Sequence, residues 1–100
     1  MVLEHVLIEV PETEAAAYER AFALARPLVM AQPGCLSCRL LPRLDHHGHY
    51  LLLIEWTSRE AHTEGFRRSP AYREWSALLH PFYRVFPTVK YYALKNPTDE

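Results

Sequence analysis

Four aromatic side chains between residues 56 and 75 have the types and the spacing to surround a flat ligand. They are Trp56, Phe66, Tyr72 and Trp75. Aromatic rings hold other rings by stacking and edge contacts, which require no charged partner. Packing in an ordinary hydrophobic core is the alternative for each, and it has more weight for Trp56 and Trp75. We predict that the four residues line a substrate pocket.

Two histidines near this cluster are candidates for a general base, and Tyr72 is a third catalytic candidate. Imidazole suits the role because its pKa lies close to neutral pH. His5 is bracketed by two leucines on one face of an apolar strand, and His62 follows on the helix predicted after residue 56. The alternatives are a structural His5, satisfied by a backbone carbonyl or placed at a subunit surface, and a His62 that faces solvent.

Two further groups have the residues of known motifs without their context. His46, His47 and His49 share one loop, but adjacent histidines on a turn seldom converge on one ion, so we expect no physiological metal site. Cys35 and Cys38 have CxxC spacing, but a redox pair opens a helix, whereas these two open a predicted strand. Residues three apart on a strand point to opposite faces, so we expect the two sulfurs to diverge.

Three carboxylates, Glu4, Glu9 and Glu55, lie on predicted strands. We interpret Glu55 as half of a structural ion pair with Arg39 or Arg43 of a facing strand, an arrangement that adds little net stability. No catalytic role is assigned to the other two. The basic residues near position 67 are interspersed with acidic ones, which indicates a solvated helix face.

Helix-start signals mark the elements that must position the aromatic cluster. The run 50–56 is β-branched, aromatic and leucine-rich, as expected of a strand. Thr57 and Glu60 then have the spacing of a capping box. Ser69-Pro70 supplies a capping hydroxyl followed by a proline at the first helical position. The stretch therefore predicts a strand, a helix, a break and a second helix.

The rest of the chain completes a β-α-β-β-α-β order. Expected strands cover residues 2–10, 35–44, 50–56 and 85–94, and a first helix runs from residue 13 to about residue 31. Glycines at 34 and 48 fit positive-φ positions in the connections. This order predicts a ferredoxin-like α+β fold, with both helices on one side of a four-stranded antiparallel sheet. The opposite face keeps apolar residues, so we expect a second copy to cover it.

Length and charge limit the classes of function. One hundred residues make one domain, which we place at 1–95 with a polar tail at 96–100. A net charge of −1 argues against a nucleic-acid partner, because such domains usually have a basic face. The sequence has no apolar run near the ~20 residues of a membrane span. With no export signal and two cysteines, a cytoplasmic location is expected.

Four segments resemble the antibiotic-biosynthesis monooxygenase family of dimeric α+β barrels. They are the short first strand, Q-P-G-C-L at 32–36, L-I-E-W-T-S-R-E-A at 53–61 and S-P-A-Y at 69–72. The resemblance extends over nearly the whole chain and implies a homodimer built through the sheet faces. It also implies chemistry, because characterised relatives include cofactor-free oxygenases acting on polycyclic or quinol-type phenols, and haem-degrading enzymes.

The chain departs from the family pattern at Phe66, where many members carry a histidine and the haem-degrading members a tryptophan. Haem degraders also carry a histidine near Ser76 and an asparagine near His5 or Val6. The resemblance thus implies a cofactor-independent monooxygenase acting on a small phenolic or quinol-type aromatic molecule. In such an enzyme a base removes the phenol proton and the anion passes an electron to O2. The alternatives are a non-catalytic ligand-binding or stress-response module, and a haem-binding degrader.

Overall fold

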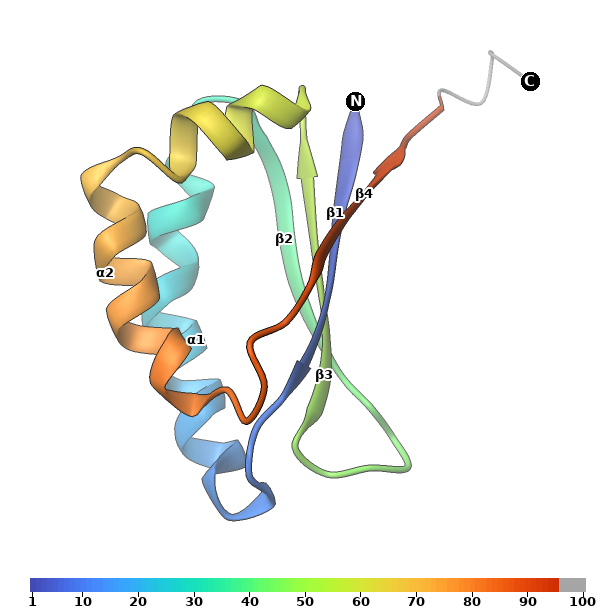
Figure 1. Cartoon of the computed structure of the whole chain (residues 1–100), viewed down its shortest axis with the longest axis vertical. Coiled ribbons are helices and arrows are strands. Elements are labelled where there is room, and N and C mark those ends of the chain that lie inside the picture. The colour runs from blue at the N-terminus through green and yellow to red at the C-terminus, as the bar shows by residue number, and fades with distance from the viewer. Residues whose placement is uncertain (96–100) are drawn as a thin grey trace.

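The computed structural model describes residues 1–95, which form a four-stranded antiparallel sheet with two helices packed on one face (Figure 1). The strand order is β2-β3-β1-β4. The elements are β1 (Val2–Glu9), α1 (Ala15–Met30), β2 (Cys35–Pro42), β3 (His49–Trp56), α2 (Pro70–Leu79) and β4 (Val89–Ala93), with a π-helix at Ala61–Phe66 and 3-10 turns at Glu12–Glu14 and His80–Phe82. This confirms the predicted ferredoxin-like α+β fold. The predicted tail, 96–100, lies outside the described residues.

Helix α1 covers the sheet with the apolar stripe that its sequence predicts. Tyr18, Phe22, Ala25 and Val29 are buried, at steps of three or four residues. The Tyr18 ring lies against Tyr50 of β3, with ring centroids 5.1 Å apart. Within residues 1–95, no helix combines the length and apolar character required to cross a membrane.

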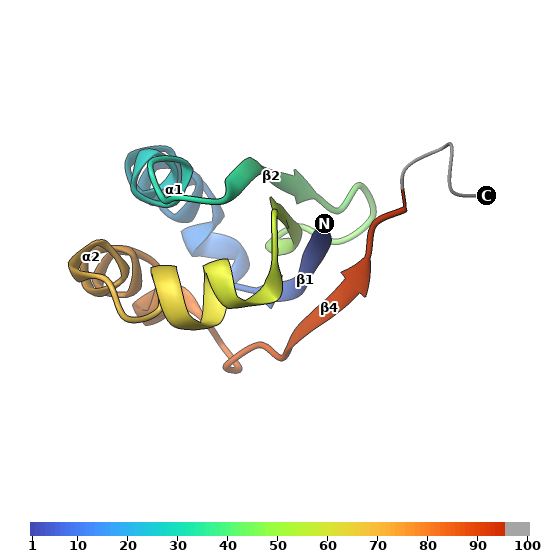
Figure 2. The ribbon, with the colours of Figure 1, turned by 90° about the horizontal axis from the view of Figure 1, so that it is seen from above.

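Strand β1 lies inside the sheet, between β3 and β4, and its residues alternate between the two faces. Val6 and Ile8 face the helices and are buried, whereas Leu7 is 66% exposed on the other face, which the helices leave open (Figure 2). By the same alternation His5 is on the open face and Glu4 is on the helix-covered face. A carboxylate therefore occupies an apolar position in the middle of the sheet.

Strand β2 corrects one prediction from the sequence. Cys35 pairs with Trp56 and Cys38 pairs with Ile54, with a shift of register between Cys35 and Ser37. Since Trp56 and Ile54 both face the helices, this bulge turns both cysteines to the same face. The expectation of opposite faces was wrong because an extra residue in a bulge shifts the alternation by one. Both cysteines are free.

The turn after β3 also differs from the prediction. The Ala61 N–H donates to Ser58 Oγ at 3.2 Å, and neither Thr57 nor Glu60 forms the predicted capping bond. Thr57 instead packs on Gly34, and its N–H donates to the Gly34 carbonyl at 2.8 Å. Gly34 has φ +84, as predicted, and a Cβ there would meet Thr57 Oγ1 at 2.7 Å. The close approach of the two loops fixes where the next helix begins.

That next helix is a π-helix followed by α2. The Arg67 N–H donates to the His62 carbonyl at 3.0 Å, a five-residue step that widens the turn. The predicted start of α2 is confirmed: the Tyr72 N–H donates to Ser69 Oγ at 3.3 Å, and Pro70 is the first helical residue. Widened helical turns of this kind occur often at functional sites. Here the turn directs His62 and Phe66 into the protein.

Candidate active site

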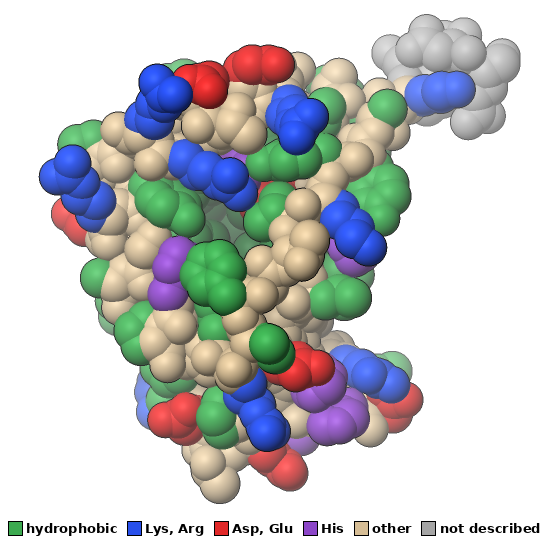
Figure 3. Space-filling model, in the orientation of Figure 1, with side chains coloured by type: hydrophobic (Ala, Val, Ile, Leu, Met, Phe, Trp, Pro, Cys, Tyr) green, Lys and Arg blue, Asp and Glu red, His purple; other side chains and the backbone are tan. Residues whose placement is uncertain are grey.

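The helix-covered side of the sheet contains a cavity of about 50 Å³. Figure 3 views the molecule from the side where α2 and β4 lie in front, and it shows a hollow among hydrophobic side chains between helices and sheet. The sheet contributes Val6 and Leu52 to its wall, the π-helix contributes Phe66, α2 contributes Trp75, and the segment before β4 contributes Phe86. Polar side chains reach the cavity at six positions: Glu4, His62, Arg67, Tyr72, His80 and Tyr83. The cavity is thus a mainly aromatic space with a few polar groups, as small-molecule sites are.

Glu4 is the acidic group of this cavity. It is 4% exposed, and one carboxylate oxygen, Oε1, accepts a hydrogen bond from the Trp56 indole Nε1 at 2.9 Å. Burial raises the pKa of Glu4 from its ordinary value of 4.5 to about 7, against the opposing effects of the Trp56 hydrogen bond and the Arg67 charge. A carboxyl group with this pKa exchanges protons near neutral pH, which is what a general base or acid requires.

His62 faces Glu4 from the π-helix. Its Nε2 approaches Glu4 Oε2 to 3.6 Å, within the range of an ion pair, and its side chain is 4% exposed. Burial lowers the pKa of His62 from 6.5 to about 4, and the positive charge of Arg67 acts in the same direction. Between about pH 4 and pH 7 the pair is therefore protonated on Glu4 and neutral on His62, because burial disfavours charge on both groups more strongly than their attraction favours it.

The second nitrogen of His62 is also occupied. Its Nδ1 is hydrogen-bonded to the hydroxyl of Tyr91 on β4. A neutral imidazole satisfies both neighbours when Tyr91 donates to Nδ1 and the Nε2–H points toward Glu4. The Arg59 guanidinium lies over the Tyr91 ring, 4.8 Å from its centroid, and holds that ring from the outside. The polar groups thus form a chain from β4 through the π-helix to β1.

The aromatic residues predicted to form a pocket are packed around this chain. The Phe66 ring meets Tyr72 and Trp75 edge to face, with centroids 5.2 Å and 5.6 Å away. Tyr72 in turn contacts the ring of His80, which directly follows the last residue of α2. Phe66 is 1% exposed and Trp75 is 5% exposed, so both also serve the core. The core and pocket interpretations are compatible for these two residues.

The structure brings four of the six predicted site residues to the cavity: His62, Phe66, Tyr72 and Trp75. Trp56 is fully buried and stands behind Glu4, where its indole holds the carboxylate. His5 is not among them. Its ring lies on the open face, edge to face with Tyr92 at 5.6 Å, beside a separate depression that includes Leu7 and Lys90. The sheet therefore separates His5 from the cavity of its own chain.

Sequence reasoning missed Glu4 and Tyr91. The signal for Glu4 was present, because it alternates with Val2, Val6 and Ile8 and thus belongs to the apolar face of its strand. A carboxylate at such a position is costly to bury unless it has a partner, which makes it a candidate for function. Tyr91 carried no such signal, because only the fold brings it to His62, 29 residues away.

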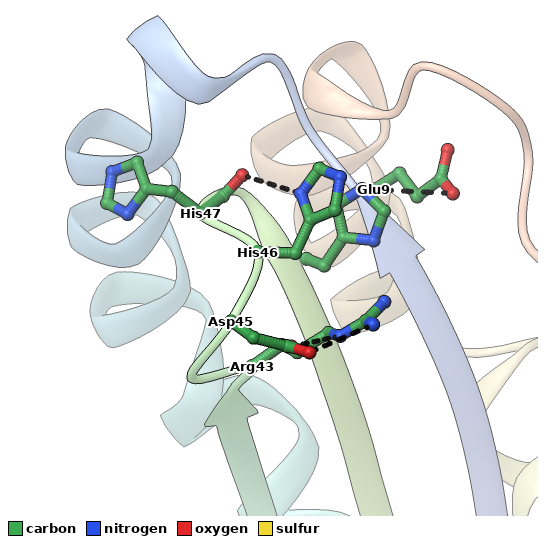
Figure 4. A network of polar contacts seen from close by, with 6 residues as sticks. Glu9, Arg43, Asp45, His46 and His47 are labelled. Carbon is green, nitrogen blue, oxygen red and sulfur yellow. Dashed lines mark hydrogen bonds and ion pairs between the residues drawn. The ribbon is translucent and has the colours of Figure 1, made fainter.

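The histidine loop between β2 and β3 has a different character (Figure 4). His46 stacks on His49 with ring centroids 3.7 Å apart, His49 lies 3.9 Å from a Glu9 oxygen, and Arg43 pairs with Asp45. The fifth labelled residue, His47, points away from the others. Across residues 1–95, no three His, Cys, Asp or Glu side chains are grouped so as to hold a metal ion. Arg43 bonds Asp45 in its own loop rather than Glu55.

The fold and the cavity define a ferredoxin-like α+β protein with a small aromatic pocket between its sheet and its helices. The sequence profile of the antibiotic biosynthesis monooxygenase family matches residues 1–78, and the chain belongs to this family. The predicted family is thereby confirmed. The chain is similar to the uncharacterized protein YczJ of Bacillus subtilis (strain 168), with 41% identity over 92 residues that cover 92% of this chain and 97% of YczJ.

Solved structures show the same architecture. A Bordetella bronchiseptica protein named for the same family superposes with a TM-score of 0.88 at 27% identity, covering 95% of this chain and 97% of its own. SnoaB, a cofactor-independent oxygenase from Streptomyces nogalater, superposes with a TM-score of 0.76 at 17% identity, covering 99% and 96% of the two chains. At this identity the likeness to SnoaB shows the shared fold alone.

Proposed function

We propose that the protein is a cofactor-independent monooxygenase that acts on a small phenolic or quinol-type aromatic molecule. Membership of the antibiotic biosynthesis monooxygenase family supports the reaction class. The observation that carries the proposal is a buried pair of titratable groups, Glu4 and His62, on the wall of a cavity that is otherwise mainly aromatic. Such a site is suited to bind an aromatic ring and to accept the proton of its hydroxyl group.

The proposed reaction converts a phenol ring C–H and its hydroxyl to a quinone. The hydroxyl proton leaves to the protein, and the resulting anion transfers an electron to O2, which then bonds to the ring. One oxygen atom stays in the product as the new carbonyl, and the other leaves as water with the two hydrogens lost by the substrate. Phe66 and Trp75 hold the ring, while the half-buried Tyr72 offers its hydroxyl to the substrate oxygen.

Binding of such a substrate requires the cavity to open. A volume of about 50 Å³ holds one or two water molecules. An apolar space needs on the order of 150 Å³ to hold a benzene-sized ring. The segment before β4 is the part of the wall best suited to move: Phe86 is 69% exposed and rests on the His80 ring with centroids 4.9 Å apart. Displacement of Phe86 enlarges the cavity without unfolding the sheet.

The open sheet face supports a homodimer, which we propose as the assembled form. Leu51 of β3 is paired with Leu7 of β1 and with Leu41 of β2, so the three form an apolar row across the sheet. Leu7 is 66% exposed and Leu41 is 41% exposed. A second copy covers this row and leaves the cavity free on the other side. Sedimentation should give twice the chain mass, and Leu7→Glu should give a monomer; a wild-type monomer would contradict the dimer.

The mainly aromatic wall of the cavity is also compatible with a second candidate, a non-catalytic module that holds an apolar metabolite. Such a module needs only the aromatic wall, and it does not use the Glu4–His62 pair. The two candidates differ in one measurement. A binding module is stabilised against heat by aromatic ligands and consumes no oxygen. The third alternative, a haem degrader, would show a Soret band on haem addition.

Oxygen consumption with a panel of substituted quinols tests the proposed reaction. The wild type should consume O2 well above the uncatalysed rate, and Tyr72→Phe should lower kcat/KM by about tenfold or more, because it removes one hydrogen bond to the reacting group. Tyr92→Phe is the matched control, since Tyr92 lies on the open face and should leave the rate unchanged. Oxygen consumption no faster than in buffer across the panel would reject the proposal.

A further inference from the structure

We propose that Glu4 is the group that accepts the hydroxyl proton of a ligand in the cavity, and that Trp56 and His62 are residues that position its carboxylate. This goes beyond the sequence-based candidates, which were two histidines and a tyrosine. The inference rests on the proposed function only for the chemical class of the ligand, a phenol. It does not require that the phenol is then oxidised.

The position of Glu4 suits a proton acceptor. Glu4 is the one acidic side chain buried among residues 1–95, and it lies on the cavity wall. Its strand is hydrogen-bonded on both edges, so the carboxylate is attached to the most rigid part of the sheet. A carboxylate has about four acceptor positions, and the Trp56 indole uses one of them. Acceptor capacity therefore remains for a ligand hydroxyl.

His62 is less suited to the same task because one ring nitrogen is hydrogen-bonded and the other faces Glu4 itself. Nδ1 is bonded to the Tyr91 hydroxyl, and Nε2 faces Glu4 at 3.6 Å. Burial lowers the pKa of His62 to about 4, which leaves it a weak base at neutral pH, whereas burial raises the pKa of Glu4 to about 7. The imidazole is thus placed to orient the carboxylate through its Nε2–H, and Trp56 fixes the other oxygen.

The charged and titratable groups that surround Glu4 come from four parts of the chain. Arg67, after the π-helix, favours the carboxylate form of Glu4. Burial, partial for Cys35, raises the pKa values of the Cys35 and Cys38 thiols on β2, of Tyr83 before β4 and of Tyr91 on β4, so these groups remain neutral near pH 7. The carboxylate is therefore the group among these whose charge changes near neutral pH.

The proposed step is a proton transfer that balances without a further reactant. The ligand O–H bond breaks, a new O–H bond forms on the Glu4 carboxylate, and the electron pair stays on the phenolate oxygen. Nothing is oxidised or reduced in this step. Arg67 lies at the same cavity and offsets the negative charge that moves to the ligand. After the ligand leaves, Glu4 returns the proton to solvent.

Binding of 4-fluorophenol, measured by ¹⁹F NMR without oxygen, tests the assignment, with fluorobenzene as the ligand that lacks the hydroxyl. In the wild type the Kd for 4-fluorophenol should tighten about tenfold between about pH 6 and pH 8, because the ionised fraction of an acid with pKa about 7 rises by that factor. Fluorobenzene should show no such tightening. Glu4→Gln should make the Kd for 4-fluorophenol independent of pH.

Other variants separate acceptor from positioning roles. Glu4→Asp keeps a carboxylate and should keep the pH dependence, which also serves if Glu4→Gln fails to fold. Trp56→Phe removes a hydrogen bond that favours the carboxylate, so the transition should move to higher pH. Glu9→Gln, on the same strand and the open face, should behave as the wild type. Three results would overturn the assignment. The Kd for 4-fluorophenol could show no pH dependence in the wild type, it could keep its pH dependence in Glu4→Gln, or it could lose that dependence only in His62→Gln.

Parallel oxygen measurements keep this inference distinct from the proposed function. If 4-fluorophenol binding depends on Glu4 and pH while no quinol is oxidised, Glu4 remains the acceptor and the monooxygenase proposal falls. If quinols are oxidised and the pH dependence of kcat/KM is the same in Glu4→Gln as in the wild type, the monooxygenase proposal stands and the Glu4 assignment is wrong.

Discussion

Strand β1 contributes the glutamate of two glutamate–histidine pairs, which lie on opposite faces of the sheet. Glu9 meets His49 across the open face at 3.9 Å, with side chains 45% and 24% exposed. Glu4 meets His62 across the cavity at 3.6 Å, with side chains 5% and 4% exposed. The residue types and the distances are nearly the same. The difference teaches that burial, rather than the choice of residues, creates the candidate site.

The two pairs differ because one is in contact with water and the other is not. Water screens the exposed Glu9–His49 pair and solvates each of its members, so the contact contributes little to the stability of the fold. The buried pair lacks this solvation, which raises the pKa of Glu4 to about 7 and lowers the pKa of His62 to about 4. Both shifts oppose charge. A proton can therefore be gained or lost at Glu4, on the wall of the cavity, near neutral pH.

The largest expected effect is on the pH dependence of stability in single variants. In His62→Gln, the free energy of unfolding should fall by on the order of 3 kcal/mol as pH rises from about 4.5 to 7. The reason is that the folded protein holds a proton on Glu4 that the unfolded chain has released. In Glu4→Gln the slope should reverse, with stability lost as pH falls from 6.5 to about 4, because folded His62 resists protonation.

In the wild type these two contributions oppose each other over most of the same pH range, so they largely cancel. Denaturant unfolding at several pH values gives the free energy of unfolding of the wild type, of His62→Gln and of Glu4→Gln. The matched control is the exposed pair: Glu9→Gln and His49→Gln should follow the wild-type curve. Parallel curves for His62→Gln and Glu4→Gln would show that neither group is shifted by burial.

A smaller effect is expected from Trp56→Phe, which removes the hydrogen bond to Glu4 and some volume from the core. We expect a loss of about 2 kcal/mol in the free energy of unfolding near pH 7, because the buried carboxylate loses its donor. The loss should be smaller below about pH 5, where Glu4 is protonated in both proteins. A loss that does not change with pH would indicate that Trp56 contributes packing alone.

The smallest effect is expected on the open face. His49→Ala should change the free energy of unfolding by less than about 0.5 kcal/mol, because its contact with Glu9 is half-exposed and the stacked His46 ring lies at the surface. Chemical denaturation at low and high salt measures the change. A loss above 1 kcal/mol would break the contrast between the two pairs.

The sequence predicts the fold well because its signals are local. The stripe of α1 from Tyr18 to Val29, the Ser69-Pro70 start of α2 and the positive-φ Gly48 each depend on a few neighbouring residues, and each is confirmed. The Thr57–Glu60 capping box fails because a serine one position later takes the role. The bulge that reorients the cysteines leaves no mark in the sequence, since one extra residue in a strand resembles any other.

The site is predicted less completely because its chemistry depends on contacts between distant segments. Aromatic spacing identifies Phe66, Tyr72 and Trp75, and alternation places His5 on its correct face. Alternation does not say which face carries a cavity, so it leaves His5 a candidate base although the cavity lies on the other face of the sheet. The same alternation places Glu4 on the apolar face of its strand, but its contact with His62 follows only from the fold, where the π-helix places the imidazole against the carboxylate.

Direct titration of the Glu4 carboxyl by NMR, in protein labelled with ¹³C at the glutamate carboxyls and assigned with Glu4→Gln, tests the central claim. We expect a pKa of about 7 for Glu4, raised by burial from its ordinary value of 4.5. Titration of Glu4 below about pH 5 would contradict it, because the cavity would then hold a solvated carboxylate no more basic than a surface one.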